Sequence, residues 1–112
     1  MLSLSSSHSY YLYAAAVDMR KSFDGLCGLI ANHTDKNPAS GEVFVFLNRS
    51  RSLIKLLHWE HGGFVLYYKR LEQGTFTPPL PGGDGRIRWP ELVLMIEGIQ
   101  VEKSTQKLRY QP

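Results

Sequence analysis

The chain has 112 residues, a length typical of one domain, and its 43% hydrophobic and 21% charged residues exclude intrinsic disorder. Its 13 Lys and Arg residues outnumber its 10 Asp and Glu residues, which gives a formal net charge of +3 and an isoelectric point of about 9.1. This mild basicity permits binding to nucleic acid without requiring it, because the outcome depends on where the charges cluster.

No apolar run approaches the roughly 20 residues that span a bilayer, so we expect no membrane contact. The segment 1–7, MLSLSSS, lacks the basic and apolar regions of a signal peptide. Cys27 is the single cysteine, which leaves no pair for an intramolecular disulfide. These features predict a cytoplasmic protein whose fold depends on its core and needs no metal, disulfide or cofactor.

The first predicted elements are a short strand and a helix. Residues 10–14, YYLYA, are aromatic and β-prone. Asp18 then has the character of a helix N-cap, and turn-forming residues at 35–38 mark the end of that helix. Between them, apolar residues recur with the spacing of one helix face at Met19, Phe23, Leu26, Cys27 and Ile30.

Three further strands are predicted from the next apolar runs. Val43–Leu47 is continuously apolar, as expected for a central strand that is covered on both faces. Leu53–Trp59 and Phe64–Tyr68 follow, and the short segments 48–52 and 60–63 connect the three strands. The simplest assembly is a meander of antiparallel strands with the early helix packed on it.

Residues 77–85, TPPLPGGDG, predict an irregular loop. Pro90 suits the first turn of a helix, Glu91 complements its positive end and Gly98 suits its C-terminal stop. The apolar face of this helix comprises Leu92, Val93, Met95 and Ile96.

We therefore predict a single domain of the α+β class. Its core, residues 1–76, is an antiparallel sheet of about four strands with one helix packed on it. A Pro/Gly-rich loop at 77–89 leads to a short C-terminal helix and a polar, frayed tail at 90–112.

Basic residues form the first candidate site. Between positions 49 and 70 there are five Lys or Arg residues and a single acid, Glu60. If the hairpin tip and the strand ends converge, these charges make a positive patch for phosphates beside exposed aromatic rings. The alternative is that they only solvate a hairpin. The predicted nucleic-acid-binding residues are Arg20, Lys21, Arg49, Arg51, Lys55, Lys69 and Arg70.

A second candidate is the sequence His58-Trp59-Glu60-His61. His58 and Glu60 share one face of a strand, which is the arrangement of a histidine–carboxylate metal pair. A metal site needs three or four ligands, however, and His8 and His33 belong to unrelated segments. We therefore predict no metal site here.

Catalytic residues are not predicted. A two-metal nuclease needs converging carboxylates, and no pair of acids has a spacing that singles it out. Cys27 falls on an apolar helix face, where an inert thiol is the ordinary outcome. Segment 82–85 lacks the lysine and the strand-to-helix context of a phosphate-binding loop. The acids considered were Asp18, Asp24, Glu42, Glu60, Glu72, Asp84 and Glu91.

Three blocks of the sequence carry a family resemblance. The first is 18–26, DMRKSFDGL. The second combines 44–46, FVF, with Asn48-Arg49 and then Lys55, Leu57 and Trp59. The third combines Gly63-Phe64 with 68–72, YKRLE, and Gly74. In this order and spacing, over about positions 10 to 76, the chain resembles the small accessory protein of bacterial insertion sequence 66 elements, the TnpB-type or second-reading-frame product.

The resemblance extends to a C-terminal helix at 90–98, which Glu97-Gly98-Ile99 closes. Ser50, Ser52 and Leu53 stand where relatives often carry more Arg and Asp. The resemblance implies participation in transposition beside a separate, larger transposase that holds the catalytic acids. It does not extend to the RNA-guided nuclease that shares the TnpB label, because this chain is far shorter and lacks the zinc-ligand cysteines.

Three functions remain as hypotheses. The first is a DNA-binding accessory factor that uses the basic hairpin and Lys69-Arg70. The second is a protein-interaction subunit that assembles with the transposase and other proteins of the element. The third is a metal-dependent nuclease built on His58, Glu60 and a neighbouring carboxylate, against which the incomplete catalytic set counts.

Overall fold

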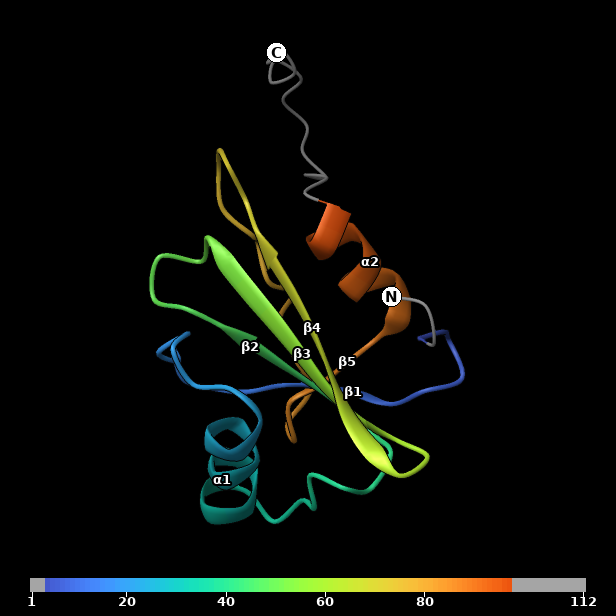
Figure 1. Cartoon of the computed structure of the whole chain (residues 1–112). Coiled ribbons are helices and arrows are strands. Elements are labelled where there is room, and N and C mark those ends of the chain that lie inside the picture. Colours follow the sequence, from blue (N-terminus) through green and yellow to red (C-terminus); the bar gives the residue numbers. More distant parts are fainter. Residues whose placement is uncertain (1–3, 98–112) are drawn as a thin grey trace.

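The computed structural model describes residues 4–97, which form a sheet of five strands with one helix on each side (Figure 1). The strands lie in the order β4-β3-β2-β1-β5. In chain order the elements are β1 (Tyr10–Leu12), α1 (Phe23–His33), β2 (Val43–Leu47), β3 (Leu53–Glu60), β4 (Gly63–Arg70), β5 (Arg86–Ile87) and α2 (Trp89–Glu97).

Two hydrophobic cores lie on opposite faces of β2, because successive side chains of a strand point to opposite sides. Phe44 and Phe46 pack with Leu26 and Ile30 of α1. Val43, Val45 and Leu47 pack with the apolar side of α2, which comprises Leu92, Met95 and Ile96. All five residues of β2 are buried. The prediction of a central strand covered on both faces is confirmed.

The prediction of a purely antiparallel meander is wrong at β1. The strand Tyr10–Leu12 pairs with β2 in parallel, in the register Tyr10 to Val43 and Leu12 to Val45. Only the part β2-β3-β4 is an antiparallel meander. A parallel pair needs a long crossover, and α1 supplies it between β1 and β2. The sheet is therefore mixed, and the fold class remains α+β.

The predicted N-cap at Asp18 is also wrong. The helix α1 begins at Phe23, with Ser22 in the N-cap position, and its first backbone bond runs from the N–H of Leu26 to the carbonyl of Ser22. Asp18 instead accepts a hydrogen bond from the N–H of Arg20 at 2.9 Å, a local turn in place of a helix start. Phe23, predicted on the buried face, is 41% exposed.

The Pro/Gly-rich segment contains an element that the sequence did not predict. Arg86 and Ile87 form β5, which pairs antiparallel with β1. The helix α2 follows at once and packs on the second face of the sheet, so two helices rather than one cover it. The N–H of Arg88 donates to Glu91 Oε1 at 2.8 Å, so Glu91 caps the helix start in addition to the charge complement that the sequence predicted for it.

None of the helices within residues 4–97 is long and apolar enough to cross a membrane. The predicted helix stop at Gly98 and the polar tail at 102–112 lie outside the described residues.

The pairing of β5 with β1 depends on Gly85. Its φ is +92°, and a Cβ there would lie 3.1 Å from the carbonyl oxygen of Leu12. Its own carbonyl accepts the N–H of Leu12 at 2.8 Å. We expect Gly85→Ala to lower the free energy of unfolding by about 1–2 kcal/mol, because the alanine is strained and crowds β1.

Urea denaturation measures this change. The matched control is Gly83→Ala, because a Cβ there has no neighbour within 4 Å and that variant should stay close to the parent protein. Equal stabilities for the two alanine variants would contradict the β1–β5 pairing.

Candidate nucleic-acid interface

The turn between β2 and β3 is a fixed platform for two arginines. Asn48 Oδ1 accepts the N–H groups of Ser52 and Leu53 at 2.9 and 3.0 Å, and Asn48 Nδ2 donates to the hydroxyls of Ser50 and Ser52. The side-chain amide of Asn48 thus connects the residues of the whole turn through hydrogen bonds. Arg49 and Arg51 project from it and are exposed.

Arg51 lies in the left-handed region, with φ of +60°. This conformation costs a non-glycine residue roughly 1 kcal/mol. The turn holds it there through the Arg51 N–H, which donates to the Asn48 carbonyl at 3.1 Å, and through the Arg51 carbonyl, which accepts the Phe76 N–H at 2.7 Å. The direction in which the Arg51 side chain leaves the backbone is therefore fixed by the turn.

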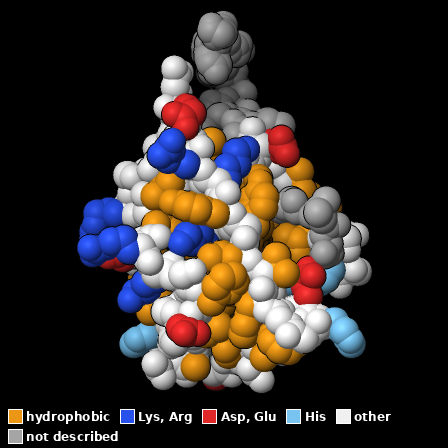
Figure 2. Space-filling model, in the orientation of Figure 1, with side chains coloured by type: hydrophobic (Ala, Val, Ile, Leu, Met, Phe, Trp, Pro, Cys, Tyr) orange, Lys and Arg blue, Asp and Glu red, His pale blue; other side chains and the backbone are white. Residues whose placement is uncertain are grey.

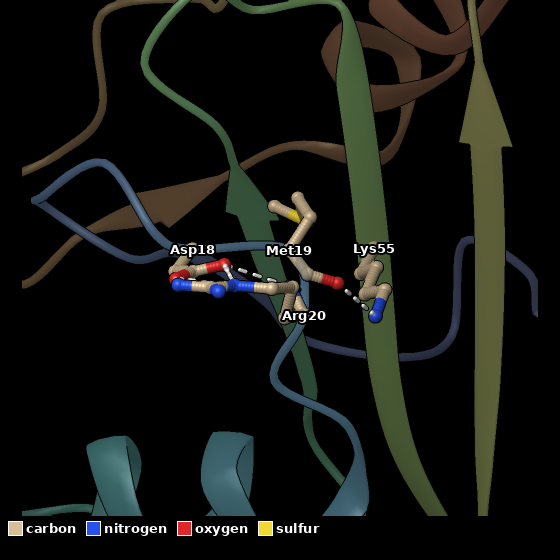
Figure 3. A network of polar contacts seen from close by, with 4 residues as sticks. All are labelled: Asp18, Met19, Arg20 and Lys55. Atoms are coloured by element: carbon tan, nitrogen blue, oxygen red, sulfur yellow. Dashed lines mark hydrogen bonds and ion pairs between the residues drawn. The ribbon is translucent and has the colours of Figure 1, made fainter.

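The segment before α1 contains a second ordered cation. The guanidinium of Arg20 contacts the carboxylate of Asp18 through Nη2 at 2.6 Å and through Nε at 3.1 Å (Figure 3). The side-chain hydrogen bond from Arg20 holds the pKa of Asp18 well below its usual range, and the Arg20 backbone N–H acts in the same direction. The pair is exposed, so its contribution to stability is small, but it fixes where the guanidinium lies.

Lys55 anchors this segment to the sheet. Lys55 is 5% exposed, and its Nζ donates to the carbonyl oxygen of Met19 at 2.9 Å (Figure 3). Nζ also donates to the carbonyl oxygen of Lys21 at 2.7 Å. The ammonium also lies 4.7 Å from the centre of the Tyr68 ring. A buried ammonium group needs such partners because burial removes the water molecules that would otherwise solvate its charge. Lys55 thereby holds residues 19–21, which we call the strap, against β3; the strap is part of the turn that the Lys21 N–H closes onto the Asp18 carbonyl.

The strap and the turn enclose an open groove of about 700 Å³. Arg20 and Arg49 line it from its two sides, and Tyr68 of β4, which is 52% exposed, lines it as well. Figure 2 shows Lys and Arg side chains gathered on the side of the molecule where the β2–β3 turn and the strap lie. The remaining lining residues are Ala16, Val17, Asp18, Met19, Asn48, Ser50 and Leu53.

Two of the seven predicted residues have their ammonium groups engaged inside the protein. Lys55 is one, as described above. Lys69 Nζ is the other, and it donates to the carbonyl of Ile96 at 2.7 Å, near the end of α2. That contact joins β4 to the helix and matches the negative end of the helix dipole.

The other five predicted residues are exposed; Arg20 and Arg49 line the groove together, and Lys21 and Arg51 lie within two residues of them in the sequence. Arg70 pairs in register with Leu53, which directly follows the β2–β3 turn. Arg70 forms an exposed ion pair with Glu72 at 3.3 Å. Among residues 4–97, no ion pair engages Lys21, Arg49 or Arg51. We call these five residues the basic rim: Arg20, Lys21, Arg49, Arg51 and Arg70.

Asn48 and Tyr68 are the parts of the site that sequence reasoning missed. Both stand in the blocks that carry the family resemblance, but neither is charged, so a search for clustered charge passed over them. The signal for Asn48 was the following 49–52, RSRS, because an amide that begins a short connection between strands commonly bonds to the backbone of its own turn.

The second candidate site, around His58, is separate from the basic rim. The side chains of Glu60 and His8 lie next to His58 there. His58 is 6% exposed, its Nε2 lies 3.1 Å from the Gly41 carbonyl, and its Nδ1 lies 3.4 Å from Glu60 Oε2. The ring of His8 packs edge-on against it at 4.8 Å, while His61 is exposed in the β3–β4 turn. Within the part of the chain that the structure describes, no three His, Cys, Asp or Glu residues are arranged to hold a metal ion.

Cys27 packs partly buried against the core beneath α1. Burial raises the pKa of its thiol, and the charge of Asp24 acts in the same direction. The thiolate needed for nucleophilic chemistry is therefore disfavoured at neutral pH.

The fold and the site together define a small α+β domain with an open groove lined by exposed arginines. Comparison with protein families then places the chain: it belongs to the IS66 Orf2-like family (TnpB_IS66), whose model matches residues 8–106. The family is that of an accessory protein of IS66 transposition. The resemblance seen in the sequence is confirmed.

Two relatives from Sinorhizobium fredii (strain NBRC 101917 / NGR234) are similar to this chain. The uncharacterized protein y4hO is 36% identical over 83 residues, which cover 73% of this chain and 72% of the relative. The uncharacterized protein y4jC is 30% identical over 84 residues, which cover 74% and 72%. No solved structure matches the chain.

The anchoring role of Lys55 is testable with Lys55→Met, which keeps the length of the side chain and removes its charge. We expect a loss of about 1 kcal/mol in the free energy of unfolding, because two lost charged hydrogen bonds outweigh the relief of a desolvated ammonium. We also expect faster hydrogen exchange at the N–H of Lys21, which bonds to the Asp18 carbonyl at 3.0 Å.

Hydrogen exchange followed by NMR provides the measurement. Lys21→Met is the control, because it removes the same charge from an exposed side chain. If both variants leave the exchange of the strap unchanged, Lys55 does not hold it.

Proposed function

We propose that this protein is a non-catalytic accessory factor of insertion-sequence transposition that binds DNA through the basic rim. The observation that carries the proposal is that two exposed arginines from separate segments, Arg20 and Arg49, line one open groove. Lys21 and Arg51 lie close to them in sequence, and Arg70 pairs with Leu53 of the groove lining. The backbone that carries these cations is held in place by the buried Lys55 and by the side-chain amide of Asn48. Cations that served only to solvate a hairpin would not require such a fixed backbone.

The rim suits phosphates better than base edges. Guanidinium groups bind phosphate oxygens through paired N–H donors, and the ordered backbone beneath Arg20, Arg49 and Arg51 reduces the entropy lost on binding. No helix of residues 4–97 presents its side chains at this rim, so major-groove reading by a helix is not what the arrangement offers. The contact should therefore be nearly independent of sequence.

The partners that follow are the element's DNA and its transposase. In this scheme the transposase supplies the carboxylates for strand cleavage and transfer, and the small protein contributes a DNA contact near it. Cytoplasmic location and the absence of any cofactor are part of the same proposal.

We expect the affinity for a labelled duplex to be about micromolar or weaker at physiological salt and to fall steeply as salt rises. With about three or four phosphate contacts, the log–log slope should be near −3. The double change Arg49→Ala and Arg51→Ala should weaken binding and flatten the slope by nearly two units. Fluorescence anisotropy over a salt series measures both quantities.

A matched control removes the same charge elsewhere. Arg86 and Arg88 are 56% and 75% exposed and lie at and beside β5, the opposite edge of the sheet from β4. Arg86→Ala with Arg88→Ala should leave the slope near its original value. If the two double variants behave alike, or if no binding occurs at low salt, the protein-interaction hypothesis takes precedence, and a nuclease-treated pull-down with the transposase tests it.

Pure protein should not cut plasmid DNA in Mg²⁺ or Mn²⁺, because Glu60 and His58 are without a third converging ligand among the described residues. Gel electrophoresis of the plasmid after incubation reports nicking and linearisation. Cleavage that disappears in Glu60→Gln would show that the His58 region is an active site.

A further inference from the structure

Strand β4 is a long, unprotected sheet edge. It contains eight residues in unbroken register with β3, and no strand of residues 4–97 pairs with its outer side. Proteins usually protect such edges with proline, bulges, inward charges or very short strands. β4 has no proline and no bulge, and its two charged residues, Lys69 and Arg70, both stand at its C-terminal end, where the Lys69 ammonium is turned to the Ile96 carbonyl. Residues 63–68 carry none of these protections.

The edge also exposes apolar side chains. Val65 is 46% exposed and Tyr68 is 52% exposed, although both belong to a regular strand. Figure 2 shows hydrophobic side chains that run diagonally over β3 and β4 in the orientation of Figure 1. Exposed apolar surface beside open backbone groups is typical of a surface that another chain covers.

The hydrogen-bond pattern identifies which backbone groups of β4 face outward. The N–H of Leu71 donates to the carbonyl of Ser52, which continues the register of the β3–β4 pair. Because bonded and non-bonded pairs alternate along an antiparallel ladder, the odd-numbered residues of β4 bond to β3. The N–H and C=O groups of Phe64, Leu66, Tyr68 and Arg70 therefore point away from the sheet.

We propose that β4 pairs antiparallel with β4 of a second copy of this chain, with Leu66 opposite Leu66 at the two-fold axis. This register joins outward-facing residues to outward-facing residues, as a bonded ladder requires. The two five-stranded sheets become one sheet of ten strands, in which the two β4 edges are paired with each other.

The side chains of β4 are complementary to themselves in this register. Phe64 lies opposite Tyr68 of the second copy, and Val65 lies opposite Tyr67, which are favourable aromatic and β-branched pairs. Lys69 lies opposite Gly63, so no two cations face each other. A parallel pairing would set the Lys69–Arg70 ends side by side, and their repulsion disfavours it.

The pairing joins backbone groups of β4 and does not need the side-chain cations of the basic rim, although Tyr68 belongs to both surfaces. It sets the two Arg70 residues at opposite ends of the joined strands, each opposite the other copy's Gly62. This offset of eight residues is roughly 27 Å. Both copies keep the groove on the same face of the joint sheet. The test of the pairing uses protein alone, so its failure leaves the DNA proposal standing and is distinguishable from it.

Light scattering after size exclusion, from about 1 to 500 μM protein, measures the oligomeric state. We expect a dimer that dissociates on dilution, as a single strand edge provides a small interface. Val65→Lys with Tyr68→Lys should return a monomer at every concentration, because both changes place charge in the paired strands. The matched control is Leu80→Lys with Leu94→Lys, at exposed apolar positions away from β4, and it should remain dimeric.

Cysteine crosslinking tests the register in a second way that does not depend on the lysine variants. In a Cys27→Ser background, Leu66→Cys places two thiols opposite each other, with Cα atoms about 5.5 Å apart, within reach of a disulfide. Val65→Cys places its two thiols two residues out of register, about 8 Å apart and beyond that reach.

Efficient oxidation to a dimer at position 66 and little at position 65 supports the pairing. A monomer at all concentrations in the parent protein would overturn it. A dimer that the β4 lysines leave intact, or equal crosslinking at positions 65 and 66, would likewise overturn it and place the interface elsewhere. If the lysine variant fails to fold by circular dichroism, the crosslinking result decides.

Discussion

The burial of β2 on both faces is the constraint on which the rest of the structure depends. A strand of five consecutive apolar residues has no polar face that can be exposed to water, so both of its faces have to be covered by other parts of the protein. The helix α1 supplies one layer and α2 the other. Because α1 must return across the sheet to reach β2, β1 is brought in parallel beside it. The mixed sheet is thus a consequence of where one apolar run falls in the chain.

The same constraint produces the basic rim. With α1 committed to the face of Phe44 and Phe46, the segment that leads into it must pass across the end of β3. Its backbone carbonyls there need a donor, and Lys55 reaches them from the sheet. The strap that results lies against the β2–β3 turn. A cation in the interior therefore determines where the surface cations of that strap are held.

Much of the fold followed from local patterns, and the differences arose from long-range contacts. The apolar run 43–47 and the two strands after it were correctly placed, because each depends on its own residues and short turns. Asp18 resembled an N-cap, but its carboxylate bonds to Arg20 and the helix begins only at Phe23, after a segment whose carbonyls Lys55 binds from β3. Strand β5 has two residues and exists only because β1 lies beside it, so no local pattern revealed it. For the site, the charge cluster predicted the exposed arginines, whereas the engagement of Lys55 and Lys69 depended on partners distant in sequence.

The place of β1 between β2 and β5 has a consequence for the order in which the protein is assembled. The hairpins β2-β3-β4 join neighbours in the chain and can form early, since local contacts cost little loop entropy. Tyr10 and Tyr11 pair on one side with residues 43 and 44 and on the other with residues 87 and 86. A ribosome releases the N-terminal strand first, yet its second partner emerges only after residue 87 has left the exit tunnel. Until then an aromatic strand has one open edge, so β1 is made before both of its neighbours and is enclosed only after both have been made.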